Sequence, residues 1–177
     1  MSLSGAADFE DVVLPHLDAA HNLARWLVRD AATAEDVVQD AVVRALGYFG
    51  SYRGGNARAW LLQIVRNTAY TALAARKLGG TASLDGLAPD GGSPALQVAD
   101  GADDPETAFC GHERSAELGR VLAALPPELR ECLVLRELEE FSYKDVARIT
   151  GVPIGTVMSR LWRARRALAA TARKEGT

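Results

Sequence analysis

A stretch of 29 residues near the middle of the chain constrains the fold most, because it has the composition of neither a helix nor a strand. It runs from Gly79 to Thr107 and reads GGTASLDGLAPDGGSPALQVADGADDPET. It is rich in Gly, Ser, Pro and Asp, has no aromatic residue and shows no sustained hydrophobic period. Structureless segments of this length are uncommon inside one compact domain. We therefore predict two domains, 8–78 and 112–173, joined by a flexible acidic linker over 79–111.

Both flanking parts show the periodicity of amphipathic helices, and neither contains an alternating apolar and polar run bounded by turn residues. We therefore predict an all-α fold of two small helical domains, without a β-sheet. Capping-box spacings support two helix starts, Thr33 with Asp36 and Ser142 with Asp145. Pro15 either kinks the first helix or opens its second half. The expected helices cover the ranges 9–29, 33–46, 57–78, 112–124, 127–139, 142–150 and 153–172.

Charge is distributed unevenly along the chain. The formal net charge is only −3, which by itself does not indicate a nucleic-acid partner. Residues 79–111 hold six acidic side chains and no basic one, whereas residues 146–177 hold seven basic side chains and one acidic one. A mildly acidic protein with a basic end is compatible with nucleic-acid binding by one face.

The basic end contains the sequence SYKDVARITGVPIGTVMSRLWRARRAL, residues 142–168. It predicts two short helices around a turn at Gly151, which is typical of a helix-turn-helix. On the second helix, at 100° per residue, one apolar face is expected to pack on the preceding helices: Ile154, Val157, Leu161, Ala164 and Leu168. Another face combines hydroxyls with arginines, as recognition helices do: Thr156, Ser159, Arg160 and Arg163, with Arg166 at its border.

The alternative interpretation of this basic helix is a solvated surface. The capped helix and the GVP turn that precede it favour DNA binding. Trp162 points to neither face; we expect it to cover the flank of the helix, and the alternative is contact with a partner.

A loop and a helix in the N-terminal part have a composition that suits single-stranded DNA. The paired glycines of SYRGGNAR, residues 51–58, predict the loop. Aromatic rings stack on exposed bases, amides read base edges and cations hold phosphate. The simpler alternative is that Trp60 and Tyr70 are core or half-buried residues. The candidate residues are Tyr52, Arg53, Gly54, Gly55, Asn56, Arg58, Trp60, Gln63, Arg66, Asn67 and Tyr70.

The helix over 33–46 presents a different surface. Opposite a buried stripe that is expected to include Leu46, it carries a mainly acidic face with one exposed valine. Such a face suits DNA poorly and could dock a protein, although a merely solvated surface is the simpler interpretation of this helix alone. The residues of this face are Asp36, Gln39, Asp40, Val43 and Arg44.

Several other classes of protein are not indicated. No window approaches 18 uninterrupted apolar residues, and the acidic N-terminus lacks a signal-peptide pattern, so we expect a cytoplasmic protein. Cys110 and Cys132 do not make a disulfide framework, and Cys132 is expected in the core. His16 and His21 belong to no catalytic or metal-binding motif. We therefore predict no enzyme, no cofactor and no metal site.

In their order along the chain, these features resemble a bacterial RNA polymerase sigma factor of the extracytoplasmic-function group, within the sigma-70 family. AEDVVQDAVVRAL looks like the family's region that docks on the polymerase clamp. YRGGNARAWLLQIVRNTAYTALAARK resembles the segment that melts and reads the −10 element. LPPELRECLVLRELEEFSYKDVARITGVPIGTVMSRLWRARRAL is similar to region 4, which reads the −35 element.

The resemblance implies a role for each candidate surface. The acidic face would dock on core polymerase, the loop and its helix would melt and read the −10 element, and Ser142 and Tyr143 would join the recognition helix at the −35 element. The implied partners are promoter DNA and core RNA polymerase, through the clamp of its largest subunit and the flap of its second-largest subunit. Members of the group are often held by an anti-sigma factor, whose existence for this chain cannot be read from the sequence.

The nearest rival function is a stand-alone helix-turn-helix repressor or activator. Such a protein needs a dimer interface or an effector pocket within residues 8–78 and binds palindromic sites alone. The chain has no sustained heptad seam, and in that function its strand-reading segment would be idle. We therefore expect a monomer when the protein is free.

Overall fold

The computed structural model describes residues 3–79 and 116–175, and every regular element within those ranges is a helix. The all-α prediction is therefore confirmed for this part of the chain. The predicted linker over 79–111 lies outside the described residues except for Gly79, as do Cys110 and His112. The helices are α1 (Leu3–Val13), α2 (Leu17–Val28), α3 (Ala31–Tyr48), α4 (Ala57–Gly79), a helix over 116–124, α6 (Pro127–Leu133), α7 (Tyr143–Thr150) and α8 (Ile154–Glu175).

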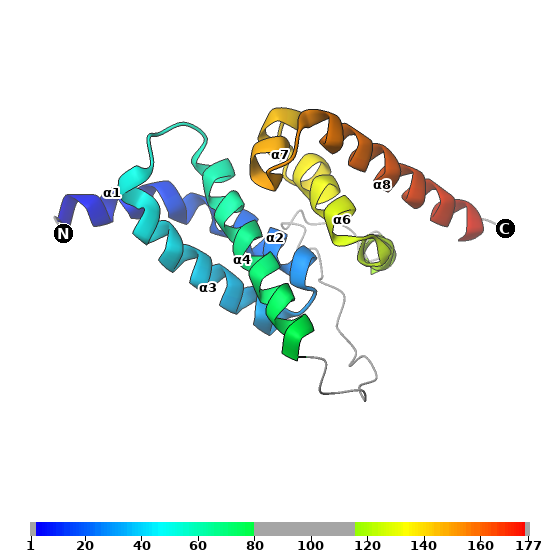
Figure 1. Ribbon diagram of the computed structural model, residues 1–177, viewed down its shortest axis with the longest axis horizontal. Helices are drawn as coiled ribbons and strands as arrows, with labels where there is room; N and C mark the ends of the chain where they lie inside the picture. The colour runs from blue at the N-terminus through cyan, green and yellow to red at the C-terminus, as the bar shows by residue number, and fades with distance from the viewer. Residues whose placement is uncertain (1–2, 80–115, 176–177) are drawn as a thin grey trace, which may run out of the picture.

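Helices α1 to α4 form one group, called here the N-terminal unit (Figure 1). α3 and α4 lie side by side, and α2 packs against both of them. The side chains that meet between these three helices recur at helical spacing, which is the pattern that buries one stripe of each helix. The fully buried ones include Leu23, Leu27, Ala41, Leu61, Leu62 and Val65.

Two helix boundaries in the N-terminal unit have clear local causes. Pro15 lies in a short 3₁₀ turn, Leu14–His16, so the proline separates α1 from α2 instead of bending one continuous helix. α3 begins at Ala31 and not at the predicted Thr33. The side chain of Asp30 accepts a hydrogen bond from the backbone N–H of Thr33 at 2.8 Å, which makes Asp30 the N-cap.

The helix over 116–124 and α6 to α8 form the second group, the C-terminal unit (Figure 1). α6 continues into a wider π-helical turn, Val134–Leu138. The capped start of α7 is confirmed, because Oγ of Ser142 accepts from the N–H of Asp145 at 3.1 Å. Gly151 ends α7 in the left-handed conformation, with φ of 70°, and so supplies the predicted turn.

The predicted buried face of α8 is largely confirmed. Val157, Leu161 and Ala164 are buried, and α8 packs on α6 and α7. Ile154 was expected in the same stripe, but 42% of it is exposed. It lies in the first turn of α8, whereas the buried side chains of this face begin at Val157. The helical period therefore predicts the side of the helix on which Ile154 lies but not its burial.

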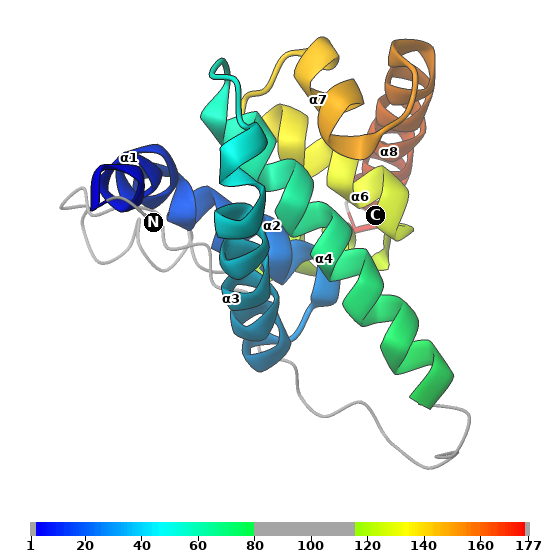
Figure 2. The same ribbon diagram turned by 60° about the vertical axis from the view of Figure 1, so that its left-hand side comes forward.

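The two units pack against each other: α4 lies along α7 and α2 contacts α6 (Figure 2). Their buried apolar residues form one contiguous cluster. Arg130 of α6 is 3% exposed and joins the units through carbonyl groups. Its guanidinium donates to Trp26 at the end of α2, at 2.8 Å, where helix carbonyls lack partners within the helix. It also donates to the carbonyls of Leu122, Ala123 and Leu125.

Among the described helices, none combines the length and the apolar character that a membrane span requires.

Candidate nucleic-acid interface

An aromatic cluster lies under the loop between α3 and α4. The ring of Tyr52 lies 4.9 Å from that of Trp60 and 5.9 Å from that of Phe49, measured between centroids. Phe9 of α1 meets Phe49 edge-on at 5.3 Å. Trp60 is thus half-buried beneath Tyr52, which agrees with the simpler alternative for this residue. Sequence reasoning missed Phe49, which anchors Tyr52 three residues away on the same 3₁₀ turn.

The loop itself is held by its own backbone. The hydroxyl of Tyr52 donates to the carbonyl of Gly55 at 3.2 Å, and Arg53 donates to the carbonyl of Gly50 at 3.0 Å. Gly54 and Gly55 both have positive φ, 83° and 95°, where glycine is favoured. These contacts preform an exposed loop with an aromatic ring at its base, a geometry that can receive an unpaired base.

Two of the predicted loop residues also have structural roles. Oδ1 of Asn56 accepts from the N–H of Ala59 at 3.0 Å, so Asn56 caps the start of α4 and leaves its amide nitrogen available. Arg58 is half-buried, and its guanidinium lies 4.7 Å from the ring centroid of Phe141 in the C-terminal unit. It also forms an ion pair with Glu139.

The predicted polar face of α4 is divided between solvent and the C-terminal unit. Asn67 is exposed and Gln63 is half-buried. Arg66 turns instead toward α6, where its Nε lies 2.9 Å from a carboxylate oxygen of Glu131, and its guanidinium covers the ring of Tyr70 at 4.3 Å. Burial, together with the negative charge of Glu131, raises the pKa of the Tyr70 hydroxyl, which therefore stays protonated.

On α8, the predicted solvent-facing set is corrected at Arg160. The side chain of Arg160 is only 17% exposed, because a nitrogen of its guanidinium lies 3.4 Å from the buried Glu131. Arg163 is exposed, and it makes no hydrogen bond or ion pair with any described residue. Ser159 is exposed and Thr156 is half-buried. Arg163 and Ser159 are thus the predicted residues that α8 offers most openly to a partner.

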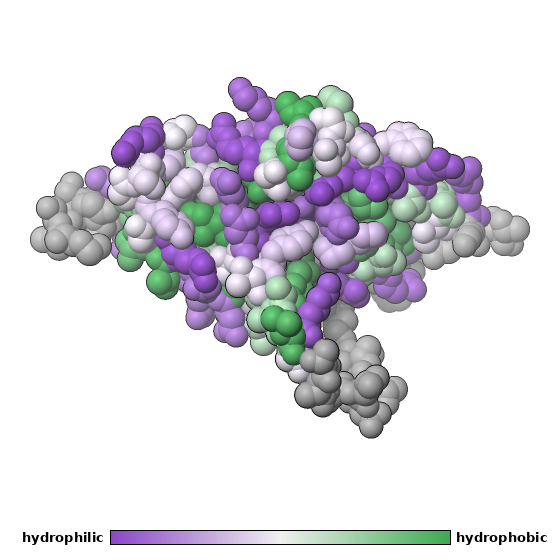
Figure 3. Space-filling view, in the orientation of Figure 1, coloured by the Kyte–Doolittle hydropathy of each residue, from purple (hydrophilic) through white to green (hydrophobic). Residues whose placement is uncertain are grey.

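Two apolar side chains of α8 are exposed, Met158, which sequence reasoning missed, and Trp162, which it placed on neither face of the helix. Met158 is 51% exposed and Trp162 is 60% exposed, next to the predicted polar face. The guanidinium of Arg166 lies 5.1 Å from the ring centroid of Trp162, one turn further along the same helix. Figure 3 shows hydrophobic residues at the top of the molecule, where α7 meets α8, beside strongly polar ones. Such apolar side chains can contact thymine methyl groups in a major groove.

The predicted residues at the start of α7 are largely engaged in local structure. Ser142 is the N-cap of α7, although it remains exposed. Tyr143 is half-buried, with the guanidinium of Arg136 lying 4.7 Å from its ring centroid. Both residues lie at the start of α7, at the opposite end of that helix from the turn at Gly151.

The acidic face of α3 is exposed as predicted. Asp36, Gln39 and Asp40 lie at the surface, and Nε of Arg44 pairs with Asp40 at 3.0 Å. Val43 is 68% exposed. The same helix end exposes two further large side chains, Leu46 at 42% and Tyr48 at 55%. The expectation that Leu46 is buried is therefore wrong. Exposed apolar groups next to carboxylates favour a protein partner over DNA.

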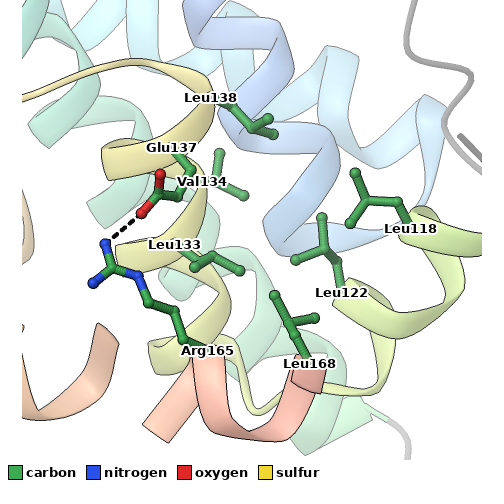
Figure 4. Close-up of a pocket in the computed structure, with 8 residues that line it drawn as sticks. All are labelled: Leu118, Leu122, Leu133, Val134, Glu137, Leu138, Arg165 and Leu168. Atoms are coloured by element: carbon green, nitrogen blue, oxygen red, sulfur yellow. Dashed lines mark hydrogen bonds and ion pairs between the residues drawn. The ribbon is translucent and has the colours of Figure 1, made fainter. Parts of the chain in front are cut away.

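A groove of about 270 Å³ opens on the C-terminal unit between the helix over 116–124, the π-helical turn and α8 (Figure 4). Arg165 and Glu137 form an ion pair at its edge, 2.5 Å apart. The groove suits an apolar side chain of a partner more than a reacting substrate, because no set of polar groups converges in it. Its apolar lining is Leu118, Leu122, Leu133, Val134, Leu138 and Leu168.

No group of three potential metal ligands converges within the described residues. Burial lowers the pKa of His16, and the nearby positive charge of Arg58 lowers it further. His21 instead lies 3.2 Å from Glu35 on the surface of the N-terminal unit. The two histidines thus have different partners.

Both units of the chain match family models of known proteins. A family model described as Sigma-70 region 2 matches residues 6–78, and one described as Sigma-70, region 4 matches residues 115–168. The RNA polymerase sigma-H factor of Pseudomonas aeruginosa is 37% identical over 165 residues, which cover 90% of this chain and 83% of that protein. The ECF RNA polymerase sigma-E factor of Escherichia coli K12 is 33% identical over 155 residues, covering 84% of this chain and 79% of that protein.

Solved structures agree with these relatives. The sigma factor RpoE from Bartonella quintana, in complex with the anti-sigma factor NepR, superposes with a TM-score of 0.72 at 30% identity, covering 94% of this chain and 97% of that one. The structure of CnrH in complex with the cytosolic domain of CnrY shares the fold, with a TM-score of 0.62 at 23% identity, covering 94% of this chain and 88% of that one.

Proposed function

This chain belongs to the sigma-70 family of bacterial RNA polymerase sigma factors, in its extracytoplasmic-function group, and on that premise we propose how its surfaces divide the work of promoter recognition. The N-terminal unit, as a domain over residues 8–78, opens and reads the −10 element. The C-terminal unit, as a domain over residues 112–173, holds the −35 element as duplex. The pairing of a preformed aromatic loop with a helix-turn-helix in one chain is the observation that carries the proposal.

The loop over 52–56 receives a base that leaves the −10 duplex. Unpairing a base costs a few kcal/mol. Stacking on an aromatic ring is worth about 1–3 kcal/mol per base, so the ring of Tyr52, backed by Trp60, can offset that cost. In this proposal, Asn67 and the amide nitrogen of Asn56 read base edges, and Arg53 holds phosphate.

The recognition helix α8 enters the major groove of the −35 element. Arg163 can bind a guanine bidentately, because its guanidinium is exposed and unengaged within the described residues. Ser159 lies four residues before Arg163 and therefore on the same side of the helix. Thr156, Arg166, Ser142 and Tyr143 complete the contact with bases or phosphates.

Core polymerase docks on α3. Asp36, Gln39, Asp40 and Arg44 supply its polar contacts around the exposed Val43. We assign this face to the clamp of the largest subunit and the C-terminal unit to the flap of the second-largest subunit, and the leucine-lined groove in Figure 4 offers an apolar seat there.

The chain itself makes and breaks no covalent bond, because the polymerase performs the chemistry. Its place of work is the cytoplasm, where polymerase and chromosome meet. The solved structure of the sigma factor from Bartonella quintana contains a bound anti-sigma factor. We propose that an inhibitor of this kind also binds the present chain. The rival function of a stand-alone repressor is disfavoured by the match of both units to sigma-70 regions.

The proposal is tested by transcription with purified core polymerase on a library of genomic fragments. The chain should direct initiation from a defined set of start sites, and aligning these sites yields both promoter elements. If the chain binds core polymerase but directs no initiation from any fragment, the proposed function is wrong.

The loop is tested on a promoter from that set. Tyr52→Ala should slow strand opening, and a template that is already unpaired at the −10 element should restore initiation. Tyr52→Phe is the matched control, since it keeps the ring and removes only the hydroxyl that bonds to Gly55. Equal defects in both variants would show that the loop hydrogen bond, and not stacking, matters.

A further inference from the structure

The boundary between the two units contains carboxylates that engage the candidate DNA-binding arginines. Glu131 of α6 is fully buried, and it accepts hydrogen bonds from Nε and from a terminal nitrogen of Arg66 at 2.9 and 3.2 Å. The same carboxylate lies 3.4 Å from Arg160 of α8. Glu131 therefore pairs at the same time with one cation from the strand-reading helix and one from the recognition helix.

A second carboxylate repeats this arrangement nearer to the loop. Glu139 forms an ion pair with Arg58, whose guanidinium also donates to the carbonyl of Glu139 at 2.8 Å. Asn22 of α2 donates to the other carboxylate oxygen at 2.5 Å. The side chain of Glu139 is 7% exposed, and both of these partners come from the N-terminal unit. Among the described residues, its buried charge is thus compensated from across the boundary.

The contact is a built interface and not a pair of isolated bridges. Arg130 donates across it to Trp26, and Arg29 donates across it to Ala123 at 3.2 Å. The buried apolar residues of the two units are continuous beneath these polar contacts. A buried charge that loses its partner is strongly destabilising, so the paired residues favour one defined docking of the units.

DNA phosphates and these carboxylates compete for the same guanidinium groups. Arg58 and Arg66 belong to the candidate residues predicted from the sequence for the −10 strand, and this step rests on the proposed function. While it is paired with a buried carboxylate, each guanidinium has fewer N–H donors left for a phosphate, and its positive charge is already compensated.

We propose that the free protein holds itself in an autoinhibited closed form, in which Glu131 and Glu139 act as internal substitutes for promoter phosphate and must release Arg58 and Arg66 before the −10 element can bind. The acidic face of α3 stays exposed in this form, with Val43 at its centre, so polymerase can dock before the units separate. Docking then favours the open form, as any ligand favours the state that it binds better.

Arginine footprinting with phenylglyoxal, read by mass spectrometry on the full chain, tests the closed form. Arg163 is the internal reference because it is exposed and unengaged among the described residues. Arg58 and Arg66 should react at least about tenfold more slowly than Arg163, which corresponds to an open form populated at about 10% or less. If they react as fast as Arg163, the closed form does not exist in solution and the inference is overturned.

Glu139→Gln tests whether the boundary opens as a unit. It keeps the shape of the side chain and removes its charge, and it should raise the reaction rates of both Arg58 and Arg66, although Arg66 does not contact Glu139. Glu140→Gln is the matched control, because it removes the same charge from the exposed neighbouring residue and should change neither rate. A faster rate at Arg58 alone would mean a local loss of one bridge and would overturn the inference.

The same pair of variants tests inhibition directly. Glu139→Gln should bind a fluorescein-labelled oligothymidylate more tightly than Glu140→Gln does, because more of its arginines are free. Equal binding despite exposed arginines would show that the contact masks no DNA-binding surface, and would overturn the inference.

Footprinting in the presence of core polymerase distinguishes this inference from the proposed function. Adding core polymerase to the unaltered chain should bring the rates of Arg58 and Arg66 toward that of Arg163. If transcription starts normally while both arginines stay protected in the holoenzyme, the inference fails and the proposed function stands. If polymerase does not bind at all, the proposed function fails, and footprinting of the free chain still decides whether the closed form exists.

Discussion

Arg160 illustrates how a buried partner changes the role of a residue on a helix surface. By helical angle it belongs with Ser159 and Arg163, on the face that meets DNA. Glu131 of the neighbouring helix α6 is fully buried, and a buried carboxylate is tolerated only with a compensating cation. Arg160 therefore supports the C-terminal unit in the free protein, which leaves Arg163 as the principal candidate for base recognition.

Arg163→Ala should weaken binding of the holoenzyme to its preferred −35 sequence by about 1–3 kcal/mol, because a bidentate contact to one base is lost. Fluorescence anisotropy on promoter fragments that carry single changes in the −35 element measures this loss. Arg148→Ala, which removes an equal charge from the exposed surface of α7, provides the sequence-independent baseline. A loss that is uniform across all sequences would reduce Arg163 to a phosphate contact.

Cys132 is a core residue, as predicted, and is fully buried. Burial, reinforced by the charge of Glu131, raises the pKa of its thiol from 9.0 to about 11. Because the folded-state pKa is the higher one, the stability gained from the protonated thiol is complete below about pH 9 and declines as pH rises toward about 11.

Iodoacetamide at pH 8 should therefore alkylate Cys132 far more slowly in the folded chain than in the chain unfolded by urea. Mass spectrometry of the peptide that contains Cys132 measures both rates. Equal rates would show that the thiol is accessible, and would contradict its placement in the core.

At the scale of single elements, local signals predict helix ends well when one side chain does the capping. Ser142 and Gly151 bound α7 as predicted. α3 starts before its predicted position, because the Asp30 carboxylate accepts from both the N–H and the hydroxyl of Thr33 and so claims the cap. Those hydrogen bonds lower the pKa of Asp30, so its contribution to stability is present above the usual range for aspartate and is lost as pH falls through the lowered value.

The turn between α7 and α8 depends on the backbone freedom of one glycine. Gly151→Ala should lower the free energy of unfolding by about 1–2 kcal/mol, because φ of 70° is strained for alanine although nothing obstructs its Cβ. Gly155→Ala is the matched control on the same motif: its added Cβ also meets nothing within 4 Å, and its φ is not positive. Urea unfolding measures both, and equal effects would contradict a conformational cause.

At the scale of the whole molecule, the two units are coupled by Arg130, whose planar guanidinium reaches carbonyls of both. A charge that is 3% exposed needs these hydrogen bonds, and burial lowers the pKa of the guanidinium without coming near to neutralising it. Differential scanning calorimetry should therefore show one unfolding transition for the full chain. Arg130→Lys should add a second, earlier transition, because lysine cannot span the same four carbonyls. Two transitions in the unaltered chain would mean that the units fold independently.

Much of this protein follows from its sequence alone. Hydrophobic periodicity together with capping and turn residues determines the helices and the helix-turn-helix, because capping and amphipathicity act within a few residues of chain. The surfaces of α3, the loop over 52–56 and Arg163 were predicted for the same reason. What only the tertiary structure decides is which charges remain available. Arg58, Arg66 and Arg160 look like free cations on their own helices, yet each meets a buried carboxylate from another part of the chain. Ion pairing depends on distance through space, and the partners of Arg58 and Arg66 are separated from them by 81 and 65 residues of chain.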